Sequence, residues 1–187
     1  MSEALWALGR GTGVVALVMF TLTLVLGIAS RSGRPLGGLG RFGLNEIHRT
    51  AALTGVGLIA VHLASLLFDP YAQLRLVDFV APFVGSYRPL YLGLGTVAVD
   101  LLVVVTVVSL LRHVAGPRVF RAVHWLTYLL WPVALVHGLG TGTDAGSLWM
   151  DAIVVACCTA VAAAVTWRLL PAYAERGRVR VARVVAR

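Results

Sequence analysis

The sequence predicts an all-α integral membrane protein with a bundle of five transmembrane helices. Hydrophobic residues make up 59% of its 187 residues and charged residues only 13%, whereas soluble domains average about 25% charged residues. Five apolar stretches are each long enough to cross about 30 Å of hydrocarbon as a helix. Arginines gather at alternate ends of these stretches, as expected for a chain that crosses a membrane repeatedly. We therefore expect a multi-pass protein of the cell membrane.

The five predicted spans follow one another along most of the chain. They run approximately over residues 11–30, 47–68, 90–111, 119–138 and 147–170. The first span lacks a basic segment before it and is followed by further spans, so we expect a retained helix rather than a cleaved signal peptide. Residues 11–170 are expected to form one membrane domain and residues 171–187 a basic cytoplasmic tail.

The distribution of arginine predicts the orientation of the chain, which contains no lysine. Arginines dominate residues 30–49, 112–121 and 168–187, whereas the connections at 69–89 and 139–146 are balanced or acidic. Arginine-rich connections stay in the cytoplasm, so the N-terminus is predicted outside and the C-terminus inside. A net charge of +8 also suggests nucleic-acid binding, but this partner is excluded because the arginines lie at the ends of membrane spans.

The connection between the second and third spans is long and aromatic. It contains Tyr71, Phe79, Phe83 and Tyr87. Aromatic residues favour the boundary between lipid and water, so we expect this segment to lie on the outer surface. It would either cover a site there or simply follow the membrane.

Four of the five histidines form two pairs of similar spacing. His48 and His62 are 14 residues apart in the second span, and His124 and His137 are 13 apart in the fourth. A 14-residue step of helix covers about 21 Å, and both helices are predicted to run from inside to outside. His48 and His124 then share an inner level, and His62 and His137 an outer level. Neutral imidazole is a good axial ligand for haem iron, so the pattern predicts two b-type haems, each held by two histidines.

The two spacings predict different helical phases. A 14-residue step ends about 40° short of full turns, so His48 and His62 share one face, whereas a 13-residue step ends about 140° off. We expect a distortion of the fourth helix near Pro132, which removes a backbone donor, or a tilt that lets the two haems lie on different flanks.

Several other residues are candidates for supporting roles. Arg49 and Arg121 neighbour the inner histidines and would either pair with haem propionates or only anchor the topology. Asp100 is an acid within a span, which favours a functional role: it would bond to a nearby threonine or relay protons to a quinone. His113 lies in a basic connection and is expected to be solvated.

The chain resembles the ferric reductase-like transmembrane domain, a superfamily of ferric reductases, NADPH oxidases and the haem subunit of a bacterial methionine-sulfoxide reductase system. The residues that carry this resemblance are His48-Arg49 with His62, and His124-Trp125 with His137. The resemblance implies an oxidoreductase membrane subunit with two haems b, which moves electrons from the cytoplasmic side to an outer acceptor. That acceptor would be ferric iron, oxygen or a partner reductase.

The electron donor is expected to be a separate molecule. Residues 171–187 alone follow the last span, and the sequence contains no dinucleotide-binding fingerprint. A cytoplasmic flavoprotein or a membrane quinol would then supply electrons. One alternative is a quinol-reactive cytochrome b of a respiratory-type complex. A second is a transporter or assembly subunit, for which histidines split between two levels are poor geometry.

Overall fold

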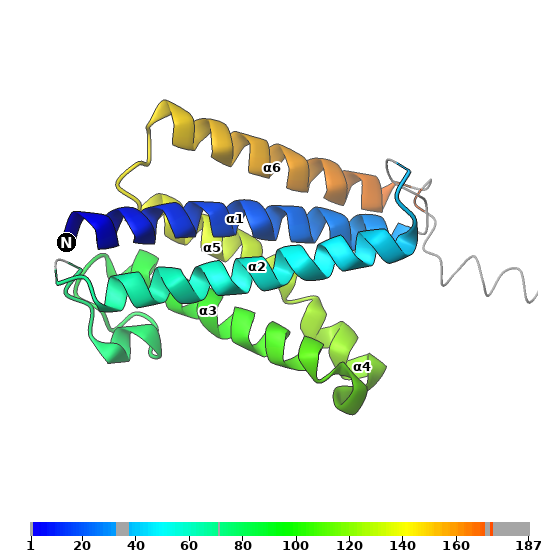
Figure 1. Ribbon diagram of the computed structural model, residues 1–187, viewed down its shortest axis with the longest axis horizontal. Coiled ribbons are helices and arrows are strands. Elements are labelled where there is room, and N and C mark those ends of the chain that lie inside the picture. The colour runs from blue at the N-terminus through cyan, green and yellow to red at the C-terminus, as the bar shows by residue number, and fades with distance from the viewer. Residues whose placement is uncertain (1, 33–37, 71, 171–172, 174–187) are drawn as a thin grey trace, which may run out of the picture. The chain divides into compact units, whose positions relative to one another are not determined.

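The computed structural model describes residues 2–32, 38–70, 72–170 and 173. Within these residues the chain forms α-helices and one short 3₁₀ helix (Figure 1). They are α1 (Ser2–Ser32), α2 (Arg41–Leu67), η1 (Leu76–Phe79), α3 (Pro89–Leu110), α4 (Arg112–His124), α5 (Thr127–Thr141) and α6 (Leu148–Leu169). The prediction of an all-α protein is confirmed for the described part of the chain. The predicted tail at 171–187 lies outside it, except for Tyr173.

The helices have the length and composition of membrane spans. α1, α2, α3 and α6 each qualify alone, and α4 and α5 qualify together as a span bent by 49°. Four or five crossings follow, in line with the predicted five. The orientation of the termini stays a prediction.

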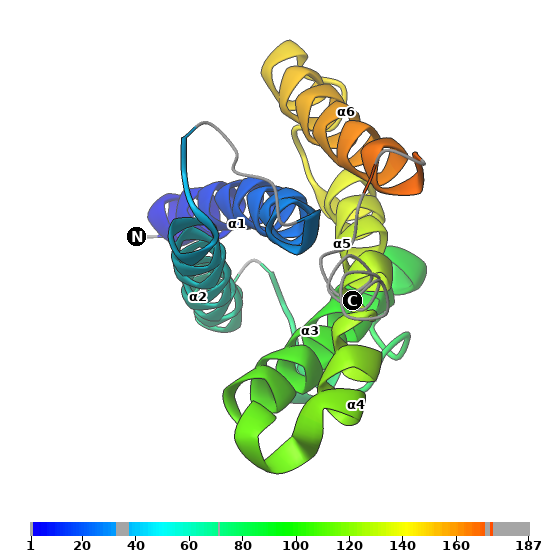
Figure 2. The same cartoon turned by 90° about the vertical axis from the view of Figure 1, so that its right-hand side faces the viewer.

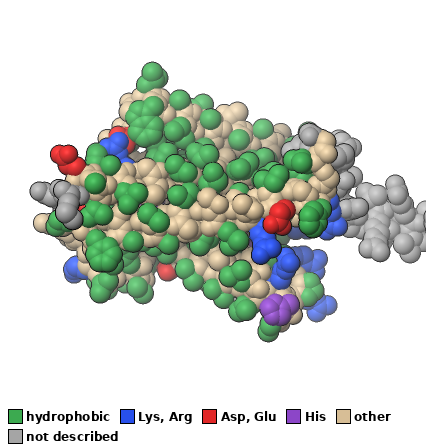
Figure 3. All heavy atoms as spheres, in the orientation of Figure 1, with side chains coloured by type: hydrophobic (Ala, Val, Ile, Leu, Met, Phe, Trp, Pro, Cys, Tyr) green, Lys and Arg blue, Asp and Glu red, His purple; other side chains and the backbone are tan. Residues whose placement is uncertain are grey.

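Large apolar side chains cover much of the surface. Leu148 is 88% exposed, Phe42 85% and Leu110 61%, and apolar side chains fill most of the face in Figure 3. Soluble proteins avoid continuous apolar surface on this scale, so these side chains suit contact with lipid. Basic side chains gather over α4 in the same view.

The predicted fourth span is not one continuous helix. The chain leaves α4 at His124, turns at Trp125 and Leu126, and enters α5 at Thr127. The expected distortion therefore exists, but its position at Pro132 was wrong, because Pro132 lies inside α5. The ring of a proline clashes with the carbonyl four residues earlier, which here is that of Tyr128, so the effect is felt one turn before the proline.

The hydrogen bonds at this break are those of a tight turn. The amides of Leu126, Tyr128 and Leu129 each donate to the carbonyl three residues before them, at 2.9 to 3.1 Å. A second irregularity divides α4 itself, where Gly116 has a φ of 77° and Pro117 follows. Glycine tolerates this left-handed conformation, and proline is well suited to restart a helix.

The chain divides into two compact units, each described here by itself. The first comprises α1 as far as Leu17 and the chain from Gly55 to Ser147. Within it, α3 packs against both α4 and α5, and Figure 2 shows α3 alongside them. Leu130 and Trp131 of α5 and Val105 of α3 are buried.

The second unit contains the chain from Val18 to Thr54 together with α6. Ile28 and Leu44 are its most deeply buried large side chains. The hydroxyl of Tyr173 donates to the Ile28 carbonyl at 2.8 Å. Cys157 of α6 is buried and unbonded to another cysteine, as expected for a small packing residue.

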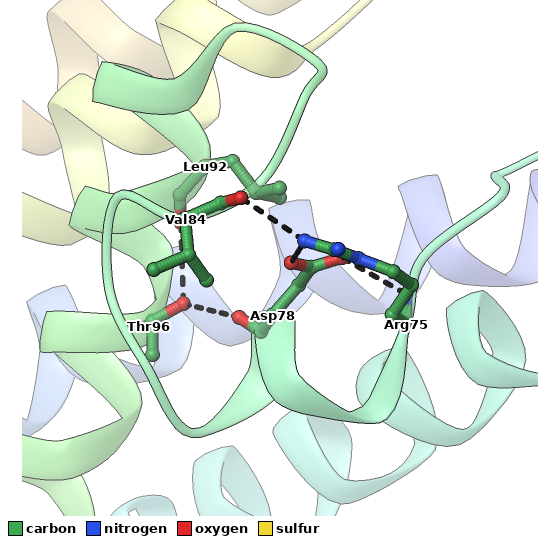
Figure 4. Close-up of polar contacts among 5 residues, drawn as sticks. All are labelled: Arg75, Asp78, Val84, Leu92 and Thr96. Atoms are coloured by element: carbon green, nitrogen blue, oxygen red, sulfur yellow. Dashed lines mark hydrogen bonds and ion pairs between the residues drawn. The ribbon is translucent and has the colours of Figure 1, made fainter.

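The connection between α2 and α3 is tied to the start of α3 (Figure 4). Arg75 forms an ion pair with the buried Asp78 at 2.9 Å and donates to the Val84 carbonyl at 3.0 Å. Thr96 of α3 donates to the Asp78 carbonyl at 2.7 Å. The ring of Phe83 lies against Gly93, where any Cβ would overlap it. These contacts fix the first turns of α3.

The opposite face of this connection is apolar. Leu76 is 71% exposed and Val80 74%, which suits the predicted position at the membrane surface. Tyr71 lies outside the described residues.

Candidate functional site

His62 is anchored to α1. Its Nδ1 lies 2.7 Å from the carbonyl oxygen of Gly9. The same ring lies against Gly13, where a Cβ would be 3.2 Å from Nδ1. The absence of a side chain at Gly13 therefore gives the imidazole its place beside α1.

His137 is anchored to α3 in the same way. Its Nδ1 lies 2.8 Å from the carbonyl oxygen of Tyr91, and a Cβ at Gly95 would be only 2.5 Å from that nitrogen. Two further contacts join the ends of α3 and α5. The ring of Tyr91 fills the space beside Gly140, and Arg88 donates to the Gly140 carbonyl.

His62 and His137 belong to the same unit and are close enough for their charges to interact. A carbonyl oxygen only accepts hydrogen bonds, so Nδ1 of each ring must carry the proton. In a neutral imidazole this leaves the lone pair on Nε2 as the metal-binding atom. Two half-buried imidazoles with free Nε2 lone pairs fit the axial ligand set of a b-type haem.

His48 has the same anchor within the second unit. Its Nδ1 lies 2.8 Å from the carbonyl oxygen of Thr23, and a Cβ at Gly27 would be 3.2 Å from its ring. Its Nε2 is therefore also in the form that binds a metal.

His124 has a different setting. It is the last residue of α4, directly before the break, and its ring stacks on Phe120 with centroids 5.0 Å apart. His113 is exposed, as predicted.

The two arginines predicted beside the inner histidines are both exposed. Nε of Arg121 donates to the Pro117 carbonyl of its own helix at 3.1 Å. At the other end of the first unit, Arg10 pairs with Asp144 at 2.5 Å and stacks over Trp6. Arg10 therefore has a protein carboxylate as its partner.

Asp100 is exposed in the middle of α3. The expected bond to Thr96 is not made, because the hydroxyl proton of Thr96 is directed to the Asp78 carbonyl. The structure thus leaves the carboxyl group of Asp100 at the surface of its helix.

The ion pair in the α2–α3 connection has a defined electrostatic state. Hydrogen bonds from Arg75 lower the pKa of Asp78 below its ordinary value of 3.8. The same interaction raises the pKa of Arg75. Both groups are therefore charged at neutral pH.

The sequence analysis did not identify the glycines that face the histidines. Gly13 and Gly27 lie 14 residues apart on α1, which equals the spacing of His62 and His48 on α2. That equality is a signal in the sequence. Among the residues that the structure describes, no group of three or more His, Cys, Asp or Glu side chains could hold a metal ion, so the candidate ligands occur in pairs at most.

Comparison with known proteins gives one match. The profile of a family described as ferric reductase like transmembrane component matches residues 12–135, which is more than half of the chain. The match includes His48, His62 and His124 and ends two residues before His137. No curated protein and no solved structure matches significantly.

Proposed function

Because the chain belongs to the ferric reductase-like transmembrane family, we propose that it carries electrons across the membrane through two b-type haems. His62 and His137 would hold the outer haem, and His48 and His124 the inner one. One observation carries the proposal: His62 and His137 interact within one unit, and each has its Nδ1 bonded to a carbonyl and its Nε2 free to bind.

The chain's own residues account for most of the requirements of such a site. Bound haem would supply one-electron redox chemistry. The carbonyls of Gly9 and Tyr91 fix the protonated nitrogen and orient each ring, as outer partners of metal-ligating histidines generally do. Apolar helices exclude water from the interior of the bundle.

The inner pair rests on the sequence pattern. His48 and His124 lie in different units, so the support is their place at the ends of two similar spacings and the anchored Nδ1 of His48. Arg49, exposed beside His48, is the better candidate for a propionate partner. Arg121 would first have to release the Pro117 carbonyl.

The proposed direction of transfer is from the cytoplasm to the outside, in an oxidoreductase subunit of the plasma membrane. The arginine distribution places the N-terminus outside and the C-terminus inside. A cytoplasmic flavoprotein or a membrane quinol would donate electrons. Ferric iron, oxygen or a partner reductase would accept them.

A quinol-reactive cytochrome b is the second candidate, and the exposed carboxyl group of Asp100 within α3 supports it. Oxidation of a quinol releases protons, and an intramembrane carboxylate is a suitable acceptor for one. This candidate predicts that a menaquinol analogue reduces the purified protein and that Asp100→Asn slows this reduction. Equal rates in both proteins would remove Asp100 from the account.

Electron transfer across a sealed membrane tests the main proposal. The purified protein would be placed in liposomes with dithionite trapped inside and ferricyanide outside. We expect external ferricyanide to be reduced well above the rate of empty vesicles. His62→Ala should return the rate to that of empty vesicles.

His113→Ala is the matched control, because His113 is an exposed histidine with no predicted ligand role. It should conduct like the unmodified protein. Wild-type protein that contains haem but conducts no faster than empty vesicles would contradict the proposal.

A further inference from the structure

Three of the four candidate ligands make the same two-point contact with a neighbouring helix. In each case Nδ1 donates to the carbonyl of one residue, and the ring lies against a glycine four residues later. We call such a carbonyl and glycine together a histidine socket. The sockets are Gly9 with Gly13 for His62, Thr23 with Gly27 for His48, and Tyr91 with Gly95 for His137.

Helix geometry explains the four-residue step. A helical side chain leans toward the N-terminus and covers the turn before its own Cα. A side chain at Gly95 would therefore cover the carbonyl of Tyr91, one turn earlier. That carbonyl already accepts within its helix, but its second lone pair can accept from an imidazole. Glycine at the fourth position is what opens this lone pair to a ring from another helix.

The sockets also repeat at the spacing of the ligands. Gly13 and Gly27 of α1 lie 14 residues apart, as do His48 and His62 of α2. On α3, the residue 14 positions after Gly95 is Ser109. The pattern with glycine is thus present for both histidines of α2 but for only the outer histidine of the bent pair.

We propose that Gly13, Gly27 and Gly95 are positioning residues for the haem ligands. α1 and α3 carry no ligand, and their role is to hold the ligand rings from behind. Each socket fixes the proton on Nδ1, sets the plane of the ring and directs Nε2 away from the supporting helix. This inference rests on the proposed function, since it assumes that the rings bind haem.

Alanine substitution tests each socket with the haem-to-protein ratio and the electron paramagnetic resonance spectrum of the oxidised protein. Gly95→Ala should lose one of two haems, because the new Cβ would overlap the ring of His137. Gly11→Ala and Gly138→Ala are the matched controls. Both positions have open space around an added Cβ, and both variants should keep two haems with unchanged spectra.

The readout separates positioning from general stability. A purely structural defect would lower both haems alike, whereas loss of a socket should remove one low-spin signal and leave the other unchanged. Loss of both signals in parallel in Gly95→Ala would overturn the proposal. Full retention of two haems with the wild-type spectrum would overturn it as well.

Gly13→Ala and Gly27→Ala provide the milder test if Gly95→Ala fails to fold. An added Cβ would lie 3.2 Å from the ring in each, an overlap that a small shift relieves. We expect both haems to remain and one low-spin signal to shift in each variant. Spectra identical to that of Gly11→Ala would contradict the inference. If the unmodified protein bound no haem, the proposed function itself would fail, which is a different result.

Discussion

The two helical segments that carry the histidine pairs accommodate different spacings by different means. α2 is continuous from Arg41 to Leu67, and its 14-residue spacing keeps His48 and His62 within about 40° of one face. The second pair is 13 residues apart, which would place its members about 140° apart on a straight helix. There the chain breaks at Trp125 and Leu126 and bends by 49°.

The comparison shows where the structure tolerates change. In α2 the phase is set by residue count alone, so each position between the histidines matters. In α4 and α5 the phase is set by a turn that lies directly beside His124. The break removes the strict link between residue count and direction, and we interpret it as the device that makes a 13-residue spacing usable.

Single-residue insertions should give the largest effect. An alanine inserted between Thr54 and Gly55 turns the rest of α2 by about 100° and moves it by about 1.5 Å. This should remove one haem completely. An alanine between Trp125 and Leu126 enters an irregular turn and should leave most of both haems. Equal losses in the two variants, measured as haem-to-protein ratios, would break the comparison.

Pro132→Ala should have the next largest effect. Proline in a helix interior costs about 3 kcal/mol, so alanine favours a straighter helix and a return of His124 toward the wrong face. We expect the apoprotein to become more stable to heat while the haem-to-protein ratio falls. A higher melting temperature with both haems retained would mean that Pro132 does not set the bend.

Phe120→Ala should act more weakly and on the inner level only. The ring of Phe120 stacks on His124, and such pairs contribute about 0.5 to 1.5 kcal/mol. This corresponds to a roughly 2- to 13-fold weaker binding of the inner haem. The measurement is a haem-transfer titration to apomyoglobin. A loss of the outer haem instead would contradict the assignment of levels.

The smallest effect should come from the connection before α3. The carbonyl that anchors His137 belongs to the first turns of α3, which Asp78 fixes through Thr96. Asp78→Asn weakens the pair with Arg75 and should slightly shift the signal of the outer haem. Alanine at the exposed Val80 serves as its control and should leave both signals unchanged.

The same ion pair gives a pH dependence with a defined sign. The pKa of Asp78 is lowered in the folded chain, so its stabilising contribution is present above its ordinary value of 3.8. The contribution is lost as the pH falls through the lowered folded value. Protease protection of the connection should therefore weaken at acid pH in the unmodified protein more than in Asp78→Asn. A connection that loosens as the pH rises would contradict this sign.

The sequence predicted the helical class and the number of apolar segments because lipid demands long apolar helices. It also predicted that the fourth span is irregular, from the phase of His124 and His137. The position of the break was not predictable from Pro132 alone, since a proline acts on the turn before it and neighbouring hydrogen bonds choose where the chain bends. The sockets escaped prediction because a backbone carbonyl has no sequence signature and only the glycine beside it is visible.

Haem counting in single and double histidine variants tests the central claim, that His62 and His137 hold one haem together. Purified wild type, His62→Ala, His137→Ala and the double variant would be compared by reduced-minus-oxidised spectra and haem-to-protein ratios. We predict two haems per chain in the wild type and one in each of the three variants, because both histidines serve the same haem. A double variant with no haem, beside single variants with one each, would mean that the two histidines serve different haems and would contradict the account.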